Sequence, residues 1–331
     1  MTAVSPATHG VAGVRERSPH PYHQAIIDAY QAVGRPKFHQ VSPVQARELL
    51  RSAVAAAPKP ADLPMLHSVE HVTIQGRRGP ILLRVYQPAG ETAGTCVFFH
   101  GGGWVMGDLD QCDSTCRRLA GGAKCRVVGV DYRLAPEHPF PEPLDDCWEA
   151  LGWVSATYPG GVIVGGESAG ANLAAACAIR VRDGAGVRLA GQLLVCPVTD
   201  HDLGTESYRQ FGNRDWLISS ADMRWFWDHY CPPQVDRNQP LVSPLRVVET
   251  AGLATAFLLV GGLDPLRDDG LSYARRLAEG GVSVTSRCDA GMVHGYLSAA
   301  AAVPAAREAL ADAVRWIEAR LSEVSPVQAS A

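Results

Sequence analysis

The 331-residue chain alternates between short apolar runs and longer segments in which apolar positions recur every three to four residues. The short runs are typical of strands, and the longer segments are typical of helices with one buried face. This alternation predicts an α/β fold with a mostly parallel eight-stranded sheet. The predicted strands are Val69–Gln75, Ile81–Tyr86, Thr95–Phe99, Arg126–Val130, Val162–Val164, Gln192–Cys196, Ala256–Val260 and Val282–Arg287.

Most of these runs are apolar throughout, as expected for parallel strands covered by helices on both faces. The first two runs carry polar or charged residues and lie close together, so we expect them to form an antiparallel hairpin at a sheet edge. An exposed edge strand near Val282–Arg287 could support a homodimer. The predicted helices of the core are Gln111–Ala120, Leu144–Thr157, Ala169–Asp183, Asp268–Glu279 and Pro304–Glu323.

Two segments interrupt the alternation. Residues 1–62 carry helical patterns at Tyr22–Ala32 and Pro43–Ala56, and residues 200–245 separate two strands by more than a crossover helix needs. We interpret 1–62 as an N-terminal helical cap segment and 200–245 as a cap insertion. The core is then 63–199 and 246–325, with a tail at 326–331. Loops at the carboxyl ends of parallel strands build active sites, which favours a cap over an insertion that only packs its own small core.

Composition limits the function. Apolar residues make up 47% of the chain and charged residues 19%, so a large core is available. The net charge of -4 offers no basic surface for nucleic acid. We expect no membrane span, because no uncharged apolar stretch reaches about 18 residues. The first twenty residues lack the apolar block of a secretory signal, so we expect a cytoplasmic protein.

The nine cysteines are odd in number and scattered, which argues against a disulfide framework. Cys112 and Cys116 form one close pair, but no second pair at zinc-site spacing accompanies them. We therefore expect no bound metal.

A G-x-S-x-G sequence lies between a predicted strand and a predicted helix. Gly166, Ser168 and Gly170 belong to this motif, in the strand–turn–helix setting that is typical of a nucleophile elbow. The glycines leave room for a strained turn that projects the serine hydroxyl, and the helix N-terminus favours developing negative charge. The motif alone often arises by chance, but its setting makes Ser168 the candidate nucleophile.

Consecutive glycines follow the predicted strand Thr95–Phe99. Acyl transfer needs N–H donors for the oxyanion of its tetrahedral intermediate, and side-chain-free backbone supplies them. The candidate donors are the N–H groups of Gly102 and Gly103, with that of Ala169 after the nucleophile. A phosphate-binding loop would need a Walker lysine or a G-x-G-x-x-G spacing, and neither is present. We expect His100, which precedes the glycines, to brace the turn through a backbone hydrogen bond.

After an elbow serine, chain order places an acid and then a histidine base. His294 follows the last predicted strand and precedes the last helix, so a loop can present it to the serine. Asp264 follows the preceding strand, where its carboxylate can fix the histidine tautomer. Asp200 is the rival acid, whereas Asp268 and Asp269 stand where helix N-terminal acids are common.

Together these motifs resemble the hormone-sensitive-lipase-like esterases, bacterial family IV type, of the α/β-hydrolase superfamily. The resemblance spans the chain from Thr95 to Tyr296. Its motifs are HGGGW at 100–104, DYRLAPEHPFP at 131–141, GESAG at 166–170, DPLRDDG at 264–270 and HGY at 294–296. Glu167 and Tyr296 stand where the family usually has Asp and Phe, changes that bear on subgroup and substrate.

The resemblance implies the α/β-hydrolase fold with a helical cap and a serine carboxylesterase that acts on small short- to medium-chain esters. It implies no metal or organic cofactor, and it implies that Asp131, Arg133, Glu137 and His138 brace the core near the site.

Other functions remain open at this stage. The same site could serve an amidase or N-deacetylase that acts on a small metabolite. A ligand-binding receptor built on the same fold is a further alternative, and it is disfavoured because the base His294 is intact. The candidate substrate-contacting residues are Trp104, Phe211 and Trp216, although such aromatic side chains could also pack only on one another.

Overall fold

The computed structural model describes residues 18–184, 186–214 and 216–324 of the chain. The predicted tail and the first seventeen residues of the N-terminal segment lie outside these ranges. A single eight-stranded sheet runs through the described part of the chain, in the order β1-β2-β4-β3-β5-β6-β7-β8. Its strands are β1 (Ser68–Gly76), β2 (Gly79–Gln87), β3 (Gly94–Phe99), β4 (Arg126–Asp131), β5 (Gly161–Glu167), β6 (Leu189–Val195), β7 (Ala256–Gly261) and β8 (Val284–Asp289).

The sheet is mostly parallel, as predicted. β1 and β2 pair antiparallel from Ser68 opposite Gln87 to Gly76 opposite Gly79, and β2 pairs antiparallel with β4. All remaining pairs are parallel. The expected hairpin at a sheet edge and the mostly parallel sheet are therefore both confirmed.

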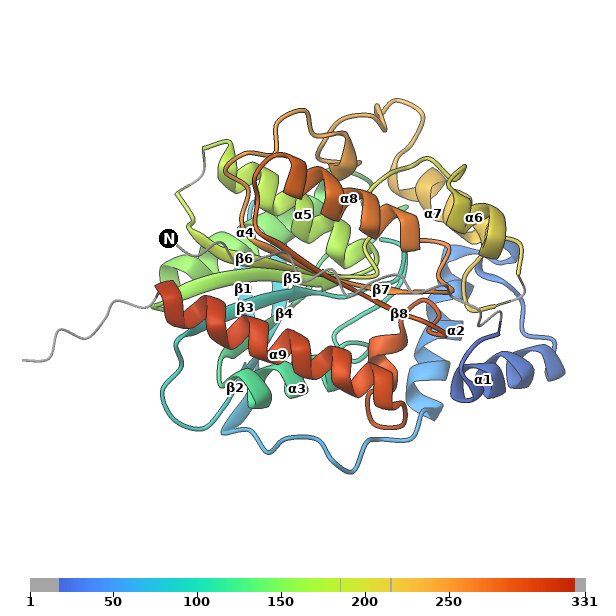
Figure 1. Cartoon of the computed structure of the whole chain (residues 1–331), viewed down its shortest axis with the longest axis horizontal. Helices are drawn as coiled ribbons and strands as arrows, with labels where there is room; N and C mark the ends of the chain where they lie inside the picture. The colour runs from blue at the N-terminus through green and yellow to red at the C-terminus, as the bar shows by residue number, and fades with distance from the viewer. Residues whose placement is uncertain (1–17, 185, 215, 325–331) are drawn as a thin grey trace, which may run out of the picture.

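Helices cover both faces of the sheet (Figure 1). One face carries α3 (Asp113–Ala123) and α9 (Pro304–Val324). The other face carries α4 (Glu142–Thr157), α5 (Ala169–Arg182) and α8 (Arg267–Glu279).

The central strands supply both hydrophobic layers because successive side chains of a strand point to opposite faces. In β3, Val97 and Phe99 join the cluster under α4 and α5. Cys96 and Phe98 join the cluster under α3 and α9. This double coverage explains why these strands read as continuous apolar runs in the sequence.

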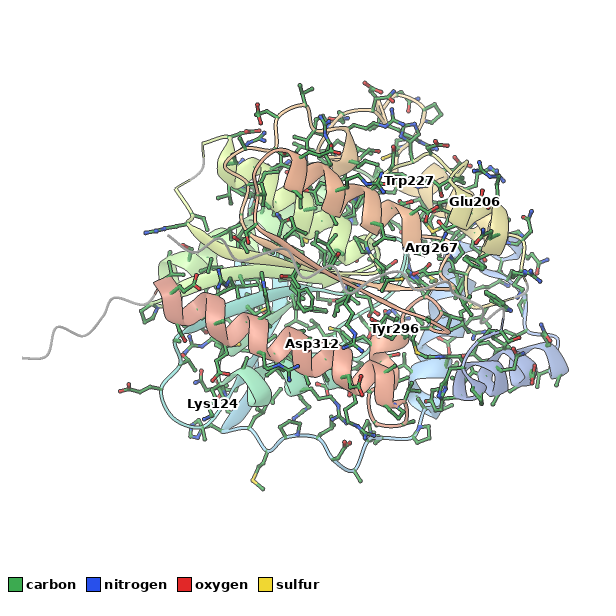
Figure 2. The ribbon with its side chains drawn as sticks, viewed as in Figure 1. Lys124, Glu206, Trp227, Arg267, Tyr296 and Asp312 are labelled. Atoms are coloured by element: carbon green, nitrogen blue, oxygen red, sulfur yellow. The ribbon has the colours of Figure 1, made fainter. Side chains whose placement is uncertain are left out.

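The segments outside this alternation gather at one end of the molecule (Figure 1). They contain α1 (Pro21–Ala32), η1 (Phe38–Gln40), α2 (Pro43–Ala56), α6 (Glu206–Phe211) and α7 (Ser220–Tyr230). The short helix η2 (Pro244–Arg246) follows and packs beside α5 and α8 before β7. In Figure 2, Glu206 and Trp227 lie toward this end, whereas Asp312 lies on α9, on the other side of the strands. Among the described helices, none has both the length and the apolar character to cross a membrane.

Some element boundaries differ from the predicted ones for local reasons. The helix predicted from Gln111 begins at Asp113, because the Asp108 carboxylate accepts the N–H groups of Asp110 and Gln111 and holds a turn there. The strand predicted from Val282 begins two residues later. The Val282 N–H is used in closing the preceding helix, where it donates to the carbonyl of Leu277.

Candidate active site

Ser168 lies in the tight turn between β5 and α5. Its backbone has φ 56° and ψ -118°, a conformation that is costly for a residue with a side chain. Backbone hydrogen bonds hold it: the Ser168 N–H donates to the carbonyl of Val195 at 2.8 Å, and the Ser168 carbonyl accepts the N–H groups of Asn172 at 3.1 Å and Val198 at 3.5 Å. The serine hydroxyl is thereby fixed at the carboxyl end of the sheet.

The glycines on either side of this turn are required by space. A Cβ on Gly170 would overlap the carbonyl oxygens of Phe99 and His100, and a Cβ on Gly166 would overlap the backbone of Gly170. The elbow therefore packs directly against the end of β3, and only glycine permits this approach.

His294 and Asp264 meet Ser168 in one chain of hydrogen bonds. The Ser168 hydroxyl donates to Nε2 of His294 at 2.9 Å, and Nδ1–H of His294 donates to Oδ2 of Asp264 at 2.8 Å. The second oxygen of Asp264 accepts the N–H of Leu266 at 2.9 Å. Since the carboxylate is fully buried and held on both oxygens, it fixes the imidazole in one tautomer and orientation.

Two carboxyl groups act on the base. Burial alone would lower the pKa of His294, but the charge and hydrogen bond of Asp264 and the charge of Glu167 outweigh it. The pKa of His294 is therefore raised above its ordinary value of 6.5. Burial in turn raises the pKa of Glu167, whose Oε1 has no hydrogen-bond partner in the described part of the chain.

The loop formed by residues 100–104, which we call the oxyanion loop, lies beside the elbow. A Cβ on Gly101 would be 3.5 Å from Cβ of Ser168. Gly102 and Gly103 have φ of 115° and 61°, values that free a glycine backbone to turn. Within the described chain, no protein acceptor takes the N–H groups of Gly102, Gly103 or Ala169. These three groups therefore have no competing partner inside the protein.

His100 braces this loop. Its Nδ1–H donates to the carbonyl of Gly101 at 2.8 Å, and its ring stacks on Tyr132 with centroids 4.2 Å apart. The Tyr132 hydroxyl donates to the carbonyl of His100 at 2.8 Å. Burial lowers the pKa of His100 to about 4, so the ring is neutral at physiological pH. This arrangement matches the predicted bracing hydrogen bond.

The other candidate acids hold the insertion in place. Asp200 pairs with Arg246 at 2.8 Å, and the Asp269 carboxylate accepts the N–H of Thr199 at 3.1 Å. Asp268 accepts the N–H of Ser207 at 2.8 Å. None of the three takes the position beside the imidazole that Asp264 occupies.

The stretch that resembles the family's structural motif carries ion pairs that reach other segments. Arg133 pairs with Asp146 of α4 at 2.7 Å. Arg47 of α2 donates to Oε1 and Oε2 of Glu137 at 2.9 and 2.5 Å. These pairs fasten residues 131–141 to the core and to the N-terminal helices.

The three predicted substrate-contacting residues lie in different settings. Trp104 is fully buried, stacked on Tyr230 at 4.3 Å and tilted against Trp227 at 4.6 Å, so its indole is enclosed among other aromatic rings. Its position therefore does not support the predicted contact with substrate. Phe211 and Trp216 stack on each other at 5.8 Å and are both partly exposed.

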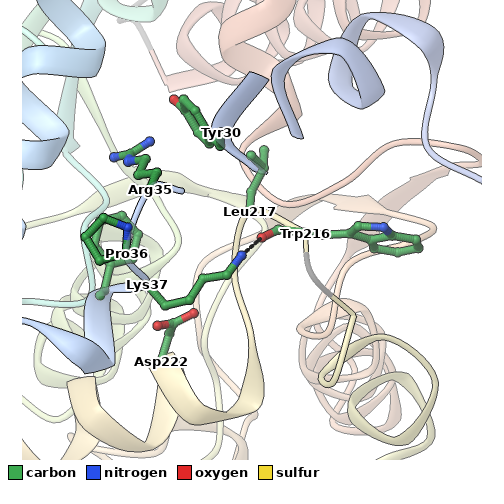
Figure 3. A pocket seen from close by; sticks show the side chains of 8 residues that line it. Tyr30, Arg35, Pro36, Lys37, Trp216, Leu217 and Asp222 are labelled. Carbon is green, nitrogen blue, oxygen red and sulfur yellow. Dashed lines mark hydrogen bonds between the residues drawn. The ribbon is translucent and has the colours of Figure 1, made fainter. Parts of the chain in front are cut away.

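A small cleft lies between the N-terminal helices and the insertion (Figure 3). Trp216 lines it with its backbone side, where its carbonyl accepts Nζ of Lys37 at 3.4 Å, while its indole points away from Lys37 and Asp222. His39 of the N-terminal segment also contacts the insertion beside this cleft, since its Nδ1 lies 2.7 Å from Oδ1 of Asp222. The cleft therefore lies where the two cap segments meet.

Sequence reasoning missed Cys196, which directly follows β6 and lies in the left-handed region at φ 43°. Its buried thiol and the ligand atoms of Asp264 and His294 all lie within 4.8 Å of one another. Burial first, and then the charges of Asp264 and Glu167, raise the pKa of the thiol well above its ordinary range. The proximity of Cys196 to Asp264 follows only from the sheet order, in which β6 and β7 are neighbours.

Comparison with known proteins agrees with this geometry. The family described as alpha/beta hydrolase fold matches residues 96–298. Carboxylic ester hydrolase LipN of Mycobacterium tuberculosis is 39% identical over 269 residues, which cover 77% of this chain and 70% of that protein. Ethyl acetate hydrolase of Pseudomonas putida is 30% identical over 311 residues, or 89% of this chain and 96% of that protein.

Solved structures extend the similarity to the fold. The hyperthermophilic esterase of the archaeon Pyrobaculum calidifontis superposes with a TM-score of 0.86 at 33% identity, over 91% of this chain and 98% of that one. A thermostable esterase of Pseudomonas putida gives a TM-score of 0.85 at 32% identity, over 92% and 98%. These matches cover most of the chain, including the elbow and the glycine loop. The chain therefore belongs to the hormone-sensitive-lipase-like esterases of the α/β-hydrolase fold family.

Proposed function

We propose that this chain is a serine carboxylesterase that hydrolyses short- to medium-chain esters of small molecules. The observation that carries the proposal is the continuous chain of hydrogen bonds from Ser168 through His294 to Asp264, with distances of 2.9 and 2.8 Å. It lies beside backbone N–H groups that have no acceptor within the described part of the protein. Acyl transfer needs this combination of activated nucleophile and oxyanion donors.

The steps follow from the geometry. Ser168 Oγ attacks the acyl carbon while its proton passes to Nε2 of His294. The N–H groups of Gly102, Gly103 and Ala169 hold the oxyanion. The imidazolium then protonates the alcohol oxygen, which leaves with its bonding electrons, and the acyl group stays on Ser168. Water, deprotonated by His294, releases the acid in the reverse sequence.

The substrate class rests on the relatives. Their names include carboxylesterase and ethyl acetate hydrolase, the second of which is named for a two-carbon acyl group. A series of p-nitrophenyl esters from acetate to laurate tests this part of the proposal. We expect kcat/KM to be highest at short or medium chain lengths, and a maximum at laurate would contradict it.

The nucleophile is tested by Ser168→Ala. Removing the nucleophile of a serine hydrolase triad costs about 10⁶ in kcat, so we expect the rate on p-nitrophenyl acetate to fall to the level of the oxyanion and binding contributions alone. Thermal unfolding of the variant serves as the folding control. A rate that survives this substitution would overturn the proposed function.

We further propose that segments 1–62 and 200–245 act together as one cap. In their described parts, Phe38 of η1 packs on Phe226 of α7 with ring centroids 6.0 Å apart, and His39 contacts Asp222. Within this cap, the partly exposed pair of Phe211 and Trp216 supplies apolar surface, which supports their predicted contact with substrate. A shift in chain-length preference on Trp216→Ala checks this contact, and an unchanged profile would contradict it.

A homodimer through β8 is also proposed. β8 ends the sheet order, so within the described residues no strand pairs with its outer side, and several of its residues are exposed. Light scattering after gel filtration checks the mass. The carbonyls of Ser283 and Asp289 accept N–H groups from the β7 side, so the N–H of Ser286 between them faces the outer edge. We expect a dimer that Ser286→Pro shifts toward monomer, because proline removes this outward N–H and disrupts pairing of an edge strand.

We place the protein in the cytoplasm because all nine cysteines, each within the described residues, are free thiols. We also expect no nucleic-acid partner, in keeping with the net charge of -4.

A further inference from the structure

The oxyanion loop ends in a strained residue. Trp104 has φ 61°, directly after Gly103 with the same value. Gly103 tolerates this region freely, but a large aromatic residue enters it only where the surroundings hold it there. This turn carries two of the three candidate oxyanion donors. Because the intrinsic φ preference of Trp104 does not favour its conformation, contacts with other segments must hold the turn.

The insertion supplies one part of the hold. The Trp104 indole is fully buried and lies parallel to the ring of Tyr230, with an interplanar angle of 3° and centroids 4.3 Å apart. Trp227 contacts it from a tilted position at 4.6 Å. Phe226 covers Gly103 so closely that a Cβ there would overlap its ring. Three aromatic residues of one helix, α7, thus contact two consecutive residues of the loop.

The N-terminal segment supplies the other part. Arg47 of α2 donates from Nε to the carbonyl of Val105 at 2.8 Å and from Nη2 to the carbonyl of Ala135 at 2.9 Å. The N–H of Ala135 donates to the carbonyl of Trp104 at 2.9 Å. Within the loop, the N–H of Met106 donates to the carbonyl of Gly102 at 2.9 Å. The turn is therefore fixed from both cap segments at once.

We propose that Trp104 is a positioning residue of the reaction, clamped by Tyr230 and Trp227 so that the Gly102 and Gly103 N–H groups face the developing oxyanion. This inference rests on the proposed esterase function. Oxyanion donors accelerate acyl transfer only when they are preorganised, so a loop free to rotate would lose rate without losing substrate binding. The cap then contributes to chemistry through the loop, in addition to any role in shaping the pocket.

The test separates kcat from KM. Trp104→Gly removes the ring while its backbone still tolerates φ 61°. Tyr230→Leu removes the stacking partner without changing any residue of the loop, and Trp104→Phe keeps an aromatic ring. We expect kcat to fall about 10- to 100-fold for the first two, because misplacing the donors costs no more than the roughly 10²–10³ that follows from losing one of them. KM should change less than about twofold. Trp104→Phe should recover part of the loss.

A second readout depends on the oxyanion directly. A trifluoromethyl ketone forms a tetrahedral adduct with an active-site serine, whereas the product alcohol binds without one. We expect the inhibition constant of the ketone to weaken in parallel with kcat/KM across the variants, while that of the alcohol stays constant. Trp153→Phe in α4 is the matched control, since its ring packs on Tyr158, a residue outside both the loop and the cap. It should leave both constants unchanged.

Each outcome decides between the two proposals. Wild-type kcat in Trp104→Gly and Tyr230→Leu, or equal weakening of ketone and alcohol binding, would overturn the clamp and leave the esterase function intact. Should Trp104→Gly fail to fold, as judged by its thermal unfolding, Tyr230→Leu and Trp104→Phe carry the comparison. A rate unaffected by Ser168→Ala would instead remove the proposed function on which the clamp depends.

Discussion

Asp264 and Asp200 both follow a parallel strand, yet their surroundings give them different tasks. Asp264 accepts the Nδ1–H of His294, whereas Asp200 pairs with Arg246. Because the asparagine amide cannot stabilise an imidazolium and favours the wrong tautomer, we expect Asp264→Asn to lower kcat by about 10³–10⁴. Asp200→Asn is the matched control and should retain nearly full kcat on the same ester. Equal losses in the two variants would contradict the assignment of the acid.

The raised pKa of His294 predicts the pH dependence. The free enzyme is active when His294 is neutral, so kcat/KM should decline as the pH falls through a midpoint above 6.5. Removing the negative charge of Glu167 lowers the pKa of the imidazolium, and Glu167→Gln should move this midpoint to lower pH. A profile of kcat/KM between pH 5 and 9 measures both midpoints. A midpoint that stays in place or rises in Glu167→Gln would show that Glu167 carries no charge there.

A glycine-to-alanine substitution should have opposite effects on stability in the elbow and in helix α4. A Cβ on Gly170 overlaps the carbonyl oxygens of Phe99 and His100, whereas a Cβ on Gly152 in helix α4 meets no atom within 4 Å. We expect Gly170→Ala to destabilise the fold by at least about 2 kcal/mol, and Gly152→Ala to stabilise it by about 0.5–1 kcal/mol. Urea unfolding of both variants measures the difference. Destabilisation by Gly152→Ala would contradict the open surroundings at that position.

For individual residues, the sequence predicted the candidate reacting groups but not the side chains that lie next to them in the folded protein. Ser168, Asp264 and His294 were identified because each follows a strand in a fixed chain order, which local pattern can reveal. Their roles stay predictions until the variants are measured. The positions of the Cys196 thiol and of the Glu167 carboxyl near His294 depend on contacts between strands and loops far apart in sequence, and no local pattern encodes those contacts.

Helix α2 shows how an element outside the core supports the site. Arg47 donates to two backbone carbonyls and pairs with Glu137, whereas Arg51, one turn later, lies 3.6 Å from Asp108 and is mostly exposed. Loss of the largely covered guanidinium leaves carbonyl oxygens unpaired, so we expect Arg47→Ala to cost about 2–4 kcal/mol of unfolding free energy. Arg51→Ala should cost less than about 1 kcal/mol. Urea unfolding measures both, and equal costs would contradict this difference.

The Arg47 hydrogen bond also lowers the pKa of Glu137 from 4.5 to about 2. Because this pKa is depressed in the folded protein, the ion pair contributes its stability above about pH 4.5. That contribution is lost as the pH falls toward 2. The stability difference between the wild type and Arg47→Ala should therefore narrow in this range, and a constant difference would show that the pair does not titrate.

Elements were predicted more reliably than their ends. All eight strands were found because they are long apolar or alternating runs, but Cys196 was placed in its strand although its left-handed backbone ends β6 at Val195. The sequence indicated a helical insertion without locating α6 or α7, since their apolar faces complement the N-terminal helices and the oxyanion loop. That fit is set by packing between distant segments, which periodicity alone does not describe.

The whole molecule determines which thiols can react. Eight of the nine cysteines, all within the described residues, are buried in the two hydrophobic layers or beside the site, and Cys288 on edge strand β8 is exposed. A buried thiol reaches a bulky reagent only when the fold opens, so its reaction rate follows the opening equilibrium. We expect one equivalent to react with Ellman's reagent in the native protein and nine after denaturation. Cys288→Ser should abolish the native reaction, and a second native thiol would show that one of the layers opens without global unfolding.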